Sequence, residues 1–94
     1  MIAMKNIKNL FKNDVIKKIL LFFNENPQCI DTAKGISVWI ACDSDIVQEM
    51  LDKLVSEGVL INHKSSSTDA YSYTNNRDII KNIEKYIKTN ISAL

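Results

Sequence analysis

The side chains that carry most enzyme and metal chemistry are scarce and scattered in this sequence. It holds one histidine, His63, and two cysteines, Cys29 and Cys42, which lie thirteen residues apart with no Cys-x-x-Cys pair. A structural zinc site needs four such ligands, and a nucleophilic site needs a serine or cysteine served by a base. A glycine-rich phosphate loop is also missing. We therefore expect a non-enzymatic protein with no cofactor and no metal, whose lone cysteines are reduced thiols in the cytoplasm.

Charged side chains offer the other chemistry, and their signs are unevenly distributed. The net charge is +1, and the basic residues are eleven lysines and one arginine, Arg77. Lysine makes good salt-dependent phosphate contacts, whereas bidentate recognition of guanine is mostly an arginine task. From Asp43 to Glu57, in contrast, five carboxylates accompany one lysine and give a local charge of −4. Any nucleic-acid binding should therefore depend on the phosphate backbone rather than on guanine edges.

The basic residues outside that segment have two interpretations. They are either the ordinary solvated faces of amphipathic helices, or a surface for DNA phosphates made from a hairpin and the two end helices. Most of them lie toward the ends of the chain: Lys5, Lys8, Lys12, Lys17, Lys18, Lys34, Lys64, Arg77, Lys81, Lys85 and Lys88.

Apolar periodicity predicts the elements that position these groups. Ninety-four residues with 46% hydrophobic content, two glycines and one proline suit a single, mostly helical domain. Helical spacing persists up to Gly58 and then gives way to alternation, which predicts a hairpin. The expected elements are an amphipathic extension at 1–12, a helix capped by Asn13 or Asp14 that stops before Pro27, a short extended segment at Cys29 and Ile30, a second helix capped by Asp31 or Thr32, a third helix from Ser44 to Glu57 capped by Asp43, strands at 59–63 and 70–74 with a polar loop at 64–69, and a final helix at 77–90.

The stretch from Ile36 to Leu60 resembles the helix-turn-helix of the winged-helix family. Ala41 occupies the small turn position and Cys42 the small apolar position that plugs the turn, because two helices that cross steeply over a short turn need a small side chain at the elbow. The apolar residues that match the family's intervals are Ile36, Ile40, Val47, Leu51 and Leu54, followed by Gly58, Val59 and Leu60.

The resemblance covers residues 14–74. It implies a winged helix-turn-helix within a single domain at 1–94: mostly α with a small β-hairpin wing, built as a three-helix core plus a C-terminal helix. An unrelated three-helix bundle with a trailing hairpin is the alternative.

For four side chains and one glycine we expect a role in packing rather than in function. We expect Trp39 to be a packing residue rather than a base-stacking platform, and Tyr71 and Tyr73 to be core residues rather than partner contacts. Cys42 is expected to be a small buried residue rather than a redox sensor. Gly35, inside a helix, is expected to permit the close approach of another helix.

The resemblance implies DNA contacts from two elements. In DNA-binding winged helices the third helix enters the major groove and the hairpin loop follows the backbone or the minor groove. Here Asp45, Glu49 and Asp52 should face outward, and three acids are difficult to reconcile with tight insertion, although one carboxylate could accept a bond from cytosine. His63 at the base of the wing could contact a phosphate, but we expect an exposed strand histidine there. The candidate nucleic-acid-binding residues are Lys34, Ser37, Ser44, Asp45, Gln48, Glu49, Lys53, His63, Lys64, Ser65 and Ser66.

Two functions therefore remain open. One is a dimeric, DNA-binding transcriptional regulator, an expectation that rests on fold-level analogy. The other is a protein-interaction module or subunit whose acidic third helix docks on a basic partner. We expect a homodimer through residues 1–12 and 77–94, because two amphipathic ends exceed what a three-helix core can cover. No membrane segment is expected, since the apolar run Ile19–Phe23 has five residues against about 20 for a span.

Overall fold

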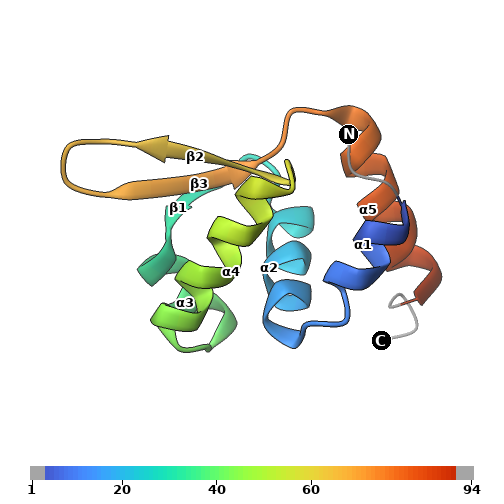
Figure 1. Ribbon diagram of the computed structural model, residues 1–94, viewed down its shortest axis with the longest axis horizontal. Helices are drawn as coiled ribbons and strands as arrows, with labels where there is room; N and C mark the ends of the chain where they lie inside the picture. Colours follow the sequence, from blue (N-terminus) through green and yellow to red (C-terminus); the bar gives the residue numbers. More distant parts are fainter. Residues whose placement is uncertain (1–3, 91–94) are drawn as a thin grey trace.

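The computed structural model describes residues 4–90, which form five helices and one small antiparallel sheet (Figure 1). The strands lie in the order β1-β3-β2, so β1 pairs with the edge of β3 that the hairpin leaves open. The expected fold class, mostly α with a β-hairpin wing, is confirmed. The elements are α1 (Met4–Leu10), α2 (Asp14–Glu25), β1 (Ile30–Thr32), α3 (Ala33–Ile40), α4 (Ser44–Ser56), β2 (Leu60–Lys64), β3 (Asp69–Tyr73) and α5 (Arg77–Asn90).

Short polar side chains begin the first two helices of the core. Asn13, rather than Asp14, caps α2, because its Oδ1 accepts hydrogen bonds from the backbone N–H groups of Val15 and Ile16 at 2.9 and 3.0 Å. Thr32 caps α3 in the same way through Gly35 N–H, at 3.1 Å. Asp43 holds the N-cap position of α4, as expected, but its side chain makes no capping hydrogen bond.

The turn between α3 and α4 has the geometry that the small residues predict. Ala41 adopts the left-handed conformation, with φ 56° and ψ 48°, which costs an L-residue about 1–2 kcal/mol. Cys42 N–H donates to the carbonyl of Ser37 at 3.0 Å and closes the end of α3. Cys42 itself is half-buried against the core.

The expected role of Gly35 is wrong. A Cβ at this position would lie 2.2 Å from Oδ1 of Asp31, so the glycine makes room for a carboxylate and not for another helix. The same Oδ1 accepts a hydrogen bond from Thr32 N–H at 2.7 Å, which holds the Asp31 side chain over the start of α3.

The hairpin strands are each displaced by one residue from the expected bounds. Val59 N–H donates to the carbonyl of Leu54 at 2.9 Å and closes the turn that follows α4, so β2 begins one residue later. At the other end, Lys64 pairs with Asp69 and extends the ladder into the expected loop.

One core joins the five helices to β2 and β3. Its fully buried side chains include Leu20 and Phe23 of α2, Ile36 of α3 and Leu51 of α4. Tyr71 and Tyr73 of β3 are also buried, as expected, with 0% and 4% of their surfaces exposed. Among residues 4–90 no helix combines the length and the apolar composition that a membrane span requires.

The two terminal helices pack on each other within the chain. Ile7 and Leu10 of α1 are buried together with Ile79 and Ile83 of α5, and the rings of Phe11 and Tyr86 stack with centroids 4.5 Å apart. We expected the apolar faces of the two terminal helices to stay uncovered in the monomer. This premise is wrong, and with it the reason for placing a dimer interface there. Residues 1–3 and 91–94 of that expected interface lie outside the described part of the chain.

Replacement of Leu51 tests whether this core supports α4. The side chain is fully buried, so Leu51→Ala should lower the free energy of unfolding by about 2–5 kcal/mol in chemical denaturation followed by circular dichroism. Ile46→Ala, on the same helix but 46% exposed, is the matched control and should cost less than about 1 kcal/mol. Equal losses for the two variants would show that Leu51 is peripheral.

Candidate nucleic-acid interface

The face of α4 that points away from the core is acidic. Val47, Leu51 and Leu54 are fully buried, whereas Asp45 and Glu49 are exposed, as is Asp52, so the expected assignment of faces is confirmed. Beside this helix the wing formed by β2 and β3 projects from the body (Figure 1). The two elements that a winged helix uses on DNA are therefore adjacent and free of any covering segment among the described residues.

A hydrogen-bonded cluster ties α4 to the wing. The hydroxyl of Tyr71, on β3, donates to Oδ1 of Asp52 at 2.8 Å. The amide of Gln48 donates to the same carboxylate at 3.1 Å and also to the Tyr71 hydroxyl. Burial, together with the bond to Asp52, raises the pKa of Tyr71, so the phenol stays protonated and keeps its donor role at neutral pH.

This cluster changes the roles of two residues on α4. The sequence predicted Gln48 as a nucleic-acid-binding residue and Asp52 as a free outward acid, but both bond to Tyr71 of the sheet. Periodicity identified Tyr71 as a core residue, and it could not show that the hydroxyl reaches α4. The candidate residues of α4 that lie outside this cluster are Ser44, Asp45, Glu49 and Lys53, all exposed.

The wing carries one candidate cation at its outer end. His63 and Lys64 are exposed at the end of β2, and Ser65 and Ser66 follow in the loop. A ring nitrogen of His63 lies 2.7 Å from Oγ of Ser72, so the expected exposed strand histidine is confirmed, with a hydrogen bond across the hairpin. Ser65 Oγ donates to the carbonyl of Thr68 at 2.7 Å and stabilises the loop.

The two candidates on α3 differ in their access to solvent. Lys34 is exposed and available for a phosphate contact. Ser37 is only 6% exposed, and its hydroxyl donates to the carbonyl of Lys34 at 2.6 Å. The assignment of Ser37 to the interface is therefore wrong, because the side chain points into the helix packing.

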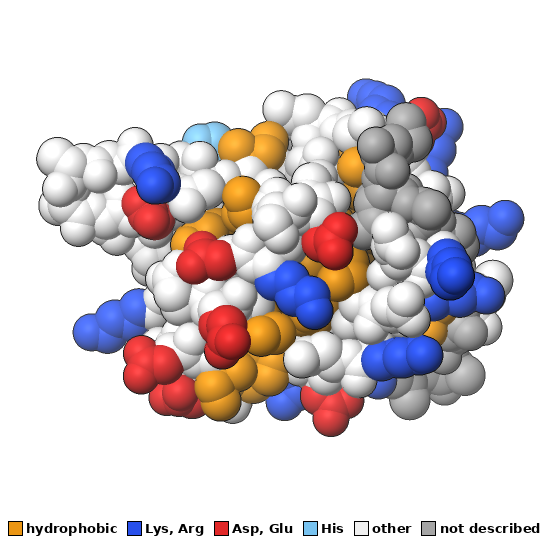
Figure 2. All heavy atoms as spheres, in the orientation of Figure 1, with side chains coloured by type: hydrophobic (Ala, Val, Ile, Leu, Met, Phe, Trp, Pro, Cys, Tyr) orange, Lys and Arg blue, Asp and Glu red, His pale blue; other side chains and the backbone are white. Residues whose placement is uncertain are grey.

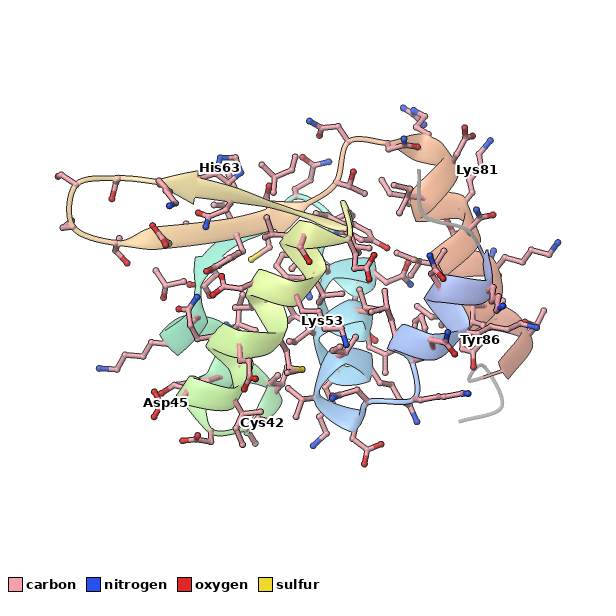
Figure 3. The ribbon with its side chains drawn as sticks, viewed as in Figure 1. Cys42, Asp45, Lys53, His63, Lys81 and Tyr86 are labelled. Atoms are coloured by element: carbon pink, nitrogen blue, oxygen red, sulfur yellow. The ribbon has the colours of Figure 1, made fainter. Side chains whose placement is uncertain are left out.

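Positive and negative side chains occupy different parts of the surface. In Figure 2, acidic side chains lie over α4, and most of the basic ones in view gather at the end formed by α1 and α5. Figure 3 shows Asp45 near the start of α4, Lys53 on the side of that helix toward α2, and Lys81 at the far end of the molecule. The long axis measures 39 Å, and the wing and the end helices lie toward its two ends in Figure 1, so a phosphate-binding surface made from both would have to span most of the molecule.

The tryptophan and the two cysteines lie outside this interface. Trp39 is 71% exposed, so its interpretation as a packing residue is wrong for the single chain. Cys29 and Cys42 are free thiols and half-buried. Burial, reinforced by the charge of Asp31, raises the pKa of Cys29 and keeps this thiol protonated at neutral pH. Among residues 4–90 no three histidine, cysteine or acidic side chains gather where they could hold a metal ion.

Comparison with known proteins gives a likeness in structure alone. No protein-family model and no curated protein matches the sequence. The structure is similar to HlyU from Vibrio cholerae N16961, with a TM-score of 0.72 and 15% sequence identity over 94% of this chain and 92% of that one. At this identity the likeness shows the fold, a winged helix with the arrangement that the apolar spacing predicted.

Two tyrosine-to-phenylalanine variants test the link between α4 and the wing. Tyr71→Phe should lower the free energy of unfolding by about 1–2 kcal/mol, because Asp52 and Gln48 lose their common partner. Tyr73→Phe is the matched control: the hydroxyl of Tyr73 is buried without a hydrogen-bond partner among the described residues, and burial raises its pKa. Its removal should leave stability unchanged or raise it by up to about 1 kcal/mol. Equal effects in thermal melts would contradict the proposed role of Tyr71.

Proposed function

We propose that this chain is a DNA-binding regulator of the winged-helix kind that holds DNA mainly through its phosphates. The observation that carries this proposal is the exposed α4 with the wing beside it, since these two elements meet the groove and the backbone in DNA-bound winged helices. The likeness to HlyU, a winged-helix transcriptional regulator, supports the same function by analogy of fold.

The proposed contacts are few and mostly cationic. Lys34 on α3, Lys53 on α4 and Lys64 on the wing are exposed, and each would displace counterions from a phosphate. Ser44 and Ser66 add hydroxyl donors at the start of α4 and in the wing loop. Asp45 and Glu49 oppose the DNA charge, so affinity is low and sequence discrimination is weak.

A second candidate function uses the same acidic face of α4 to bind a basic protein instead of DNA. Asp45 and Glu49 are exposed and form no ion pair within residues 4–90. A basic protein segment would neutralise them, and α4 would then be a docking surface rather than a reading helix.

A DNA titration at several salt concentrations separates the two functions. Fluorescence anisotropy with mixed duplex DNA should show weak binding at low salt, with a slope of log affinity against log salt of about −0.9 per phosphate contact. Lys64→Ala and Lys34→Ala should each reduce affinity by a similar factor on every sequence. Asp45→Asn combined with Glu49→Gln should increase affinity, because phosphate repulsion is removed.

Three outcomes would contradict parts of this proposal. Unchanged affinity in the charge-neutralised variant would mean that α4 does not face DNA. Tight binding of one sequence at physiological salt would mean that the carboxylates recognise bases and that the electrostatic reasoning is wrong. No binding at low salt by either protein would exclude the DNA function and favour the docking surface.

A further inference from the structure

The end of α3 presents an unusual amount of apolar surface to solvent. Trp39 and Val38 expose 71% and 76% of their surfaces, and an exposed tryptophan beside other apolar groups is typical of protein contact surfaces. The ring of Trp39 lies 6.2 Å from that of Phe22, which lies 5.2 Å from the buried Phe23. Aromatic packing that begins in the core thus continues to the surface at this point.

A hollow of about 480 Å³ lies beside the tryptophan, between α2 and the end of α3. Leu21 and Phe22, both half-buried, form its floor. Lys18 and Glu25 stand at its two ends on α2. These four residues follow each other at intervals of three, one and three, and therefore form a single stripe on the helix.

The stripe is self-complementary about its midpoint. Lys18 and Glu25 are equally distant in sequence from the point between Leu21 and Phe22. In a pair of antiparallel α2 helices related by a two-fold axis through that point, Lys18 faces Glu25 of the partner subunit, and the apolar residues meet at the axis. An interface of this symmetry requires just such a self-complementary patch.

We infer that two copies of this chain associate through the surface formed by Lys18, Leu21, Phe22, Glu25 and Trp39. Charge favours a second copy as the occupant, because a purely acidic or purely basic partner would meet one unfavourable end. Lys18 is available for the pairing, since its ammonium makes only a weak contact of 3.9 Å with the sulfur of Cys42. The inference goes beyond DNA binding and places the dimer interface away from the terminal helices.

The outward faces of the terminal helices suit self-association less well. Ile7 and Leu10 of α1 and Ile79 and Ile83 of α5 are already buried within the chain, although Ile80, Tyr86 and Ile87 of α5 are only half-buried. The exposed positions include Lys5 and Lys8 on α1 and Lys81 and Lys85 on α5. Two copies joined there would bring like charges together.

Sedimentation of the full chain across a range of concentrations tests this interface. The mass should rise from 10.7 kDa toward about twice that value, with a dissociation constant on the order of micromolar for so small a contact. Trp39→Ala should keep the circular dichroism spectrum of the native chain and remain monomeric. A wild-type protein that stays at 10.7 kDa at the highest concentration overturns the inference.

Charge reversal gives a sharper test that does not depend on removing apolar surface. Lys18→Glu alone and Glu25→Lys alone should each raise the dissociation constant about tenfold or more, because the symmetry places two like-charge pairs in each homodimer. An equimolar mixture of the two variants should restore the dimer, since both pairs are then of opposite charge. Lys81→Glu, on α5, is the control and should leave association unchanged. A mixture that stays as monomeric as its components, or a dimer that responds to Lys81→Glu instead, overturns the proposed interface.

Discussion

Burial of one apolar stripe on α4 determines the surface that this protein offers to a partner. Val47, Leu51 and Leu54 are fully buried, and with 3.6 residues per turn this leaves Asp45 and Glu49 on the opposite side of the helix. The bonds of Tyr71 with Asp52 and with Gln48 then hold the helix against the wing. The helix cannot turn its acids away from a ligand without exposing core residues and breaking these bonds.

The fold could be predicted largely from the sequence because its signals are local. Apolar spacing gave α4 to within one residue at its end, and the small residue at position 41 predicted a turn that adopts a positive φ. The hairpin was displaced by one residue because Val59 closes the helix before the strand begins. The pairing of α1 with α5 was missed, since periodicity shows that a helix has an apolar face and not which other face will cover it.

The site was less predictable because it depends on contacts between distant segments. Tyr71 and Asp52 are nineteen residues apart and meet through a hydroxyl that no periodic pattern reveals. Ser37 and Trp39 were exchanged in effect: the polar residue is buried and bonded to its own helix, and the large apolar one is exposed. The exposure of Trp39 is explained by the proposed dimer, in which a second copy of the chain would cover this side chain.

DNA could bind at the basic residues near α4 and the wing, or at those on α1 and α5. The changes in backbone amide chemical shifts on DNA binding distinguish these two complexes. In a titration of isotope-labelled protein with duplex DNA at low salt, we expect the largest shifts around Lys34, in the first turns of α4 and in the wing loop from Lys64 to Thr68, with little change in α1 and α5. Shifts confined to α1 and α5, or none at any position, would contradict a DNA interface built from α4 and the wing.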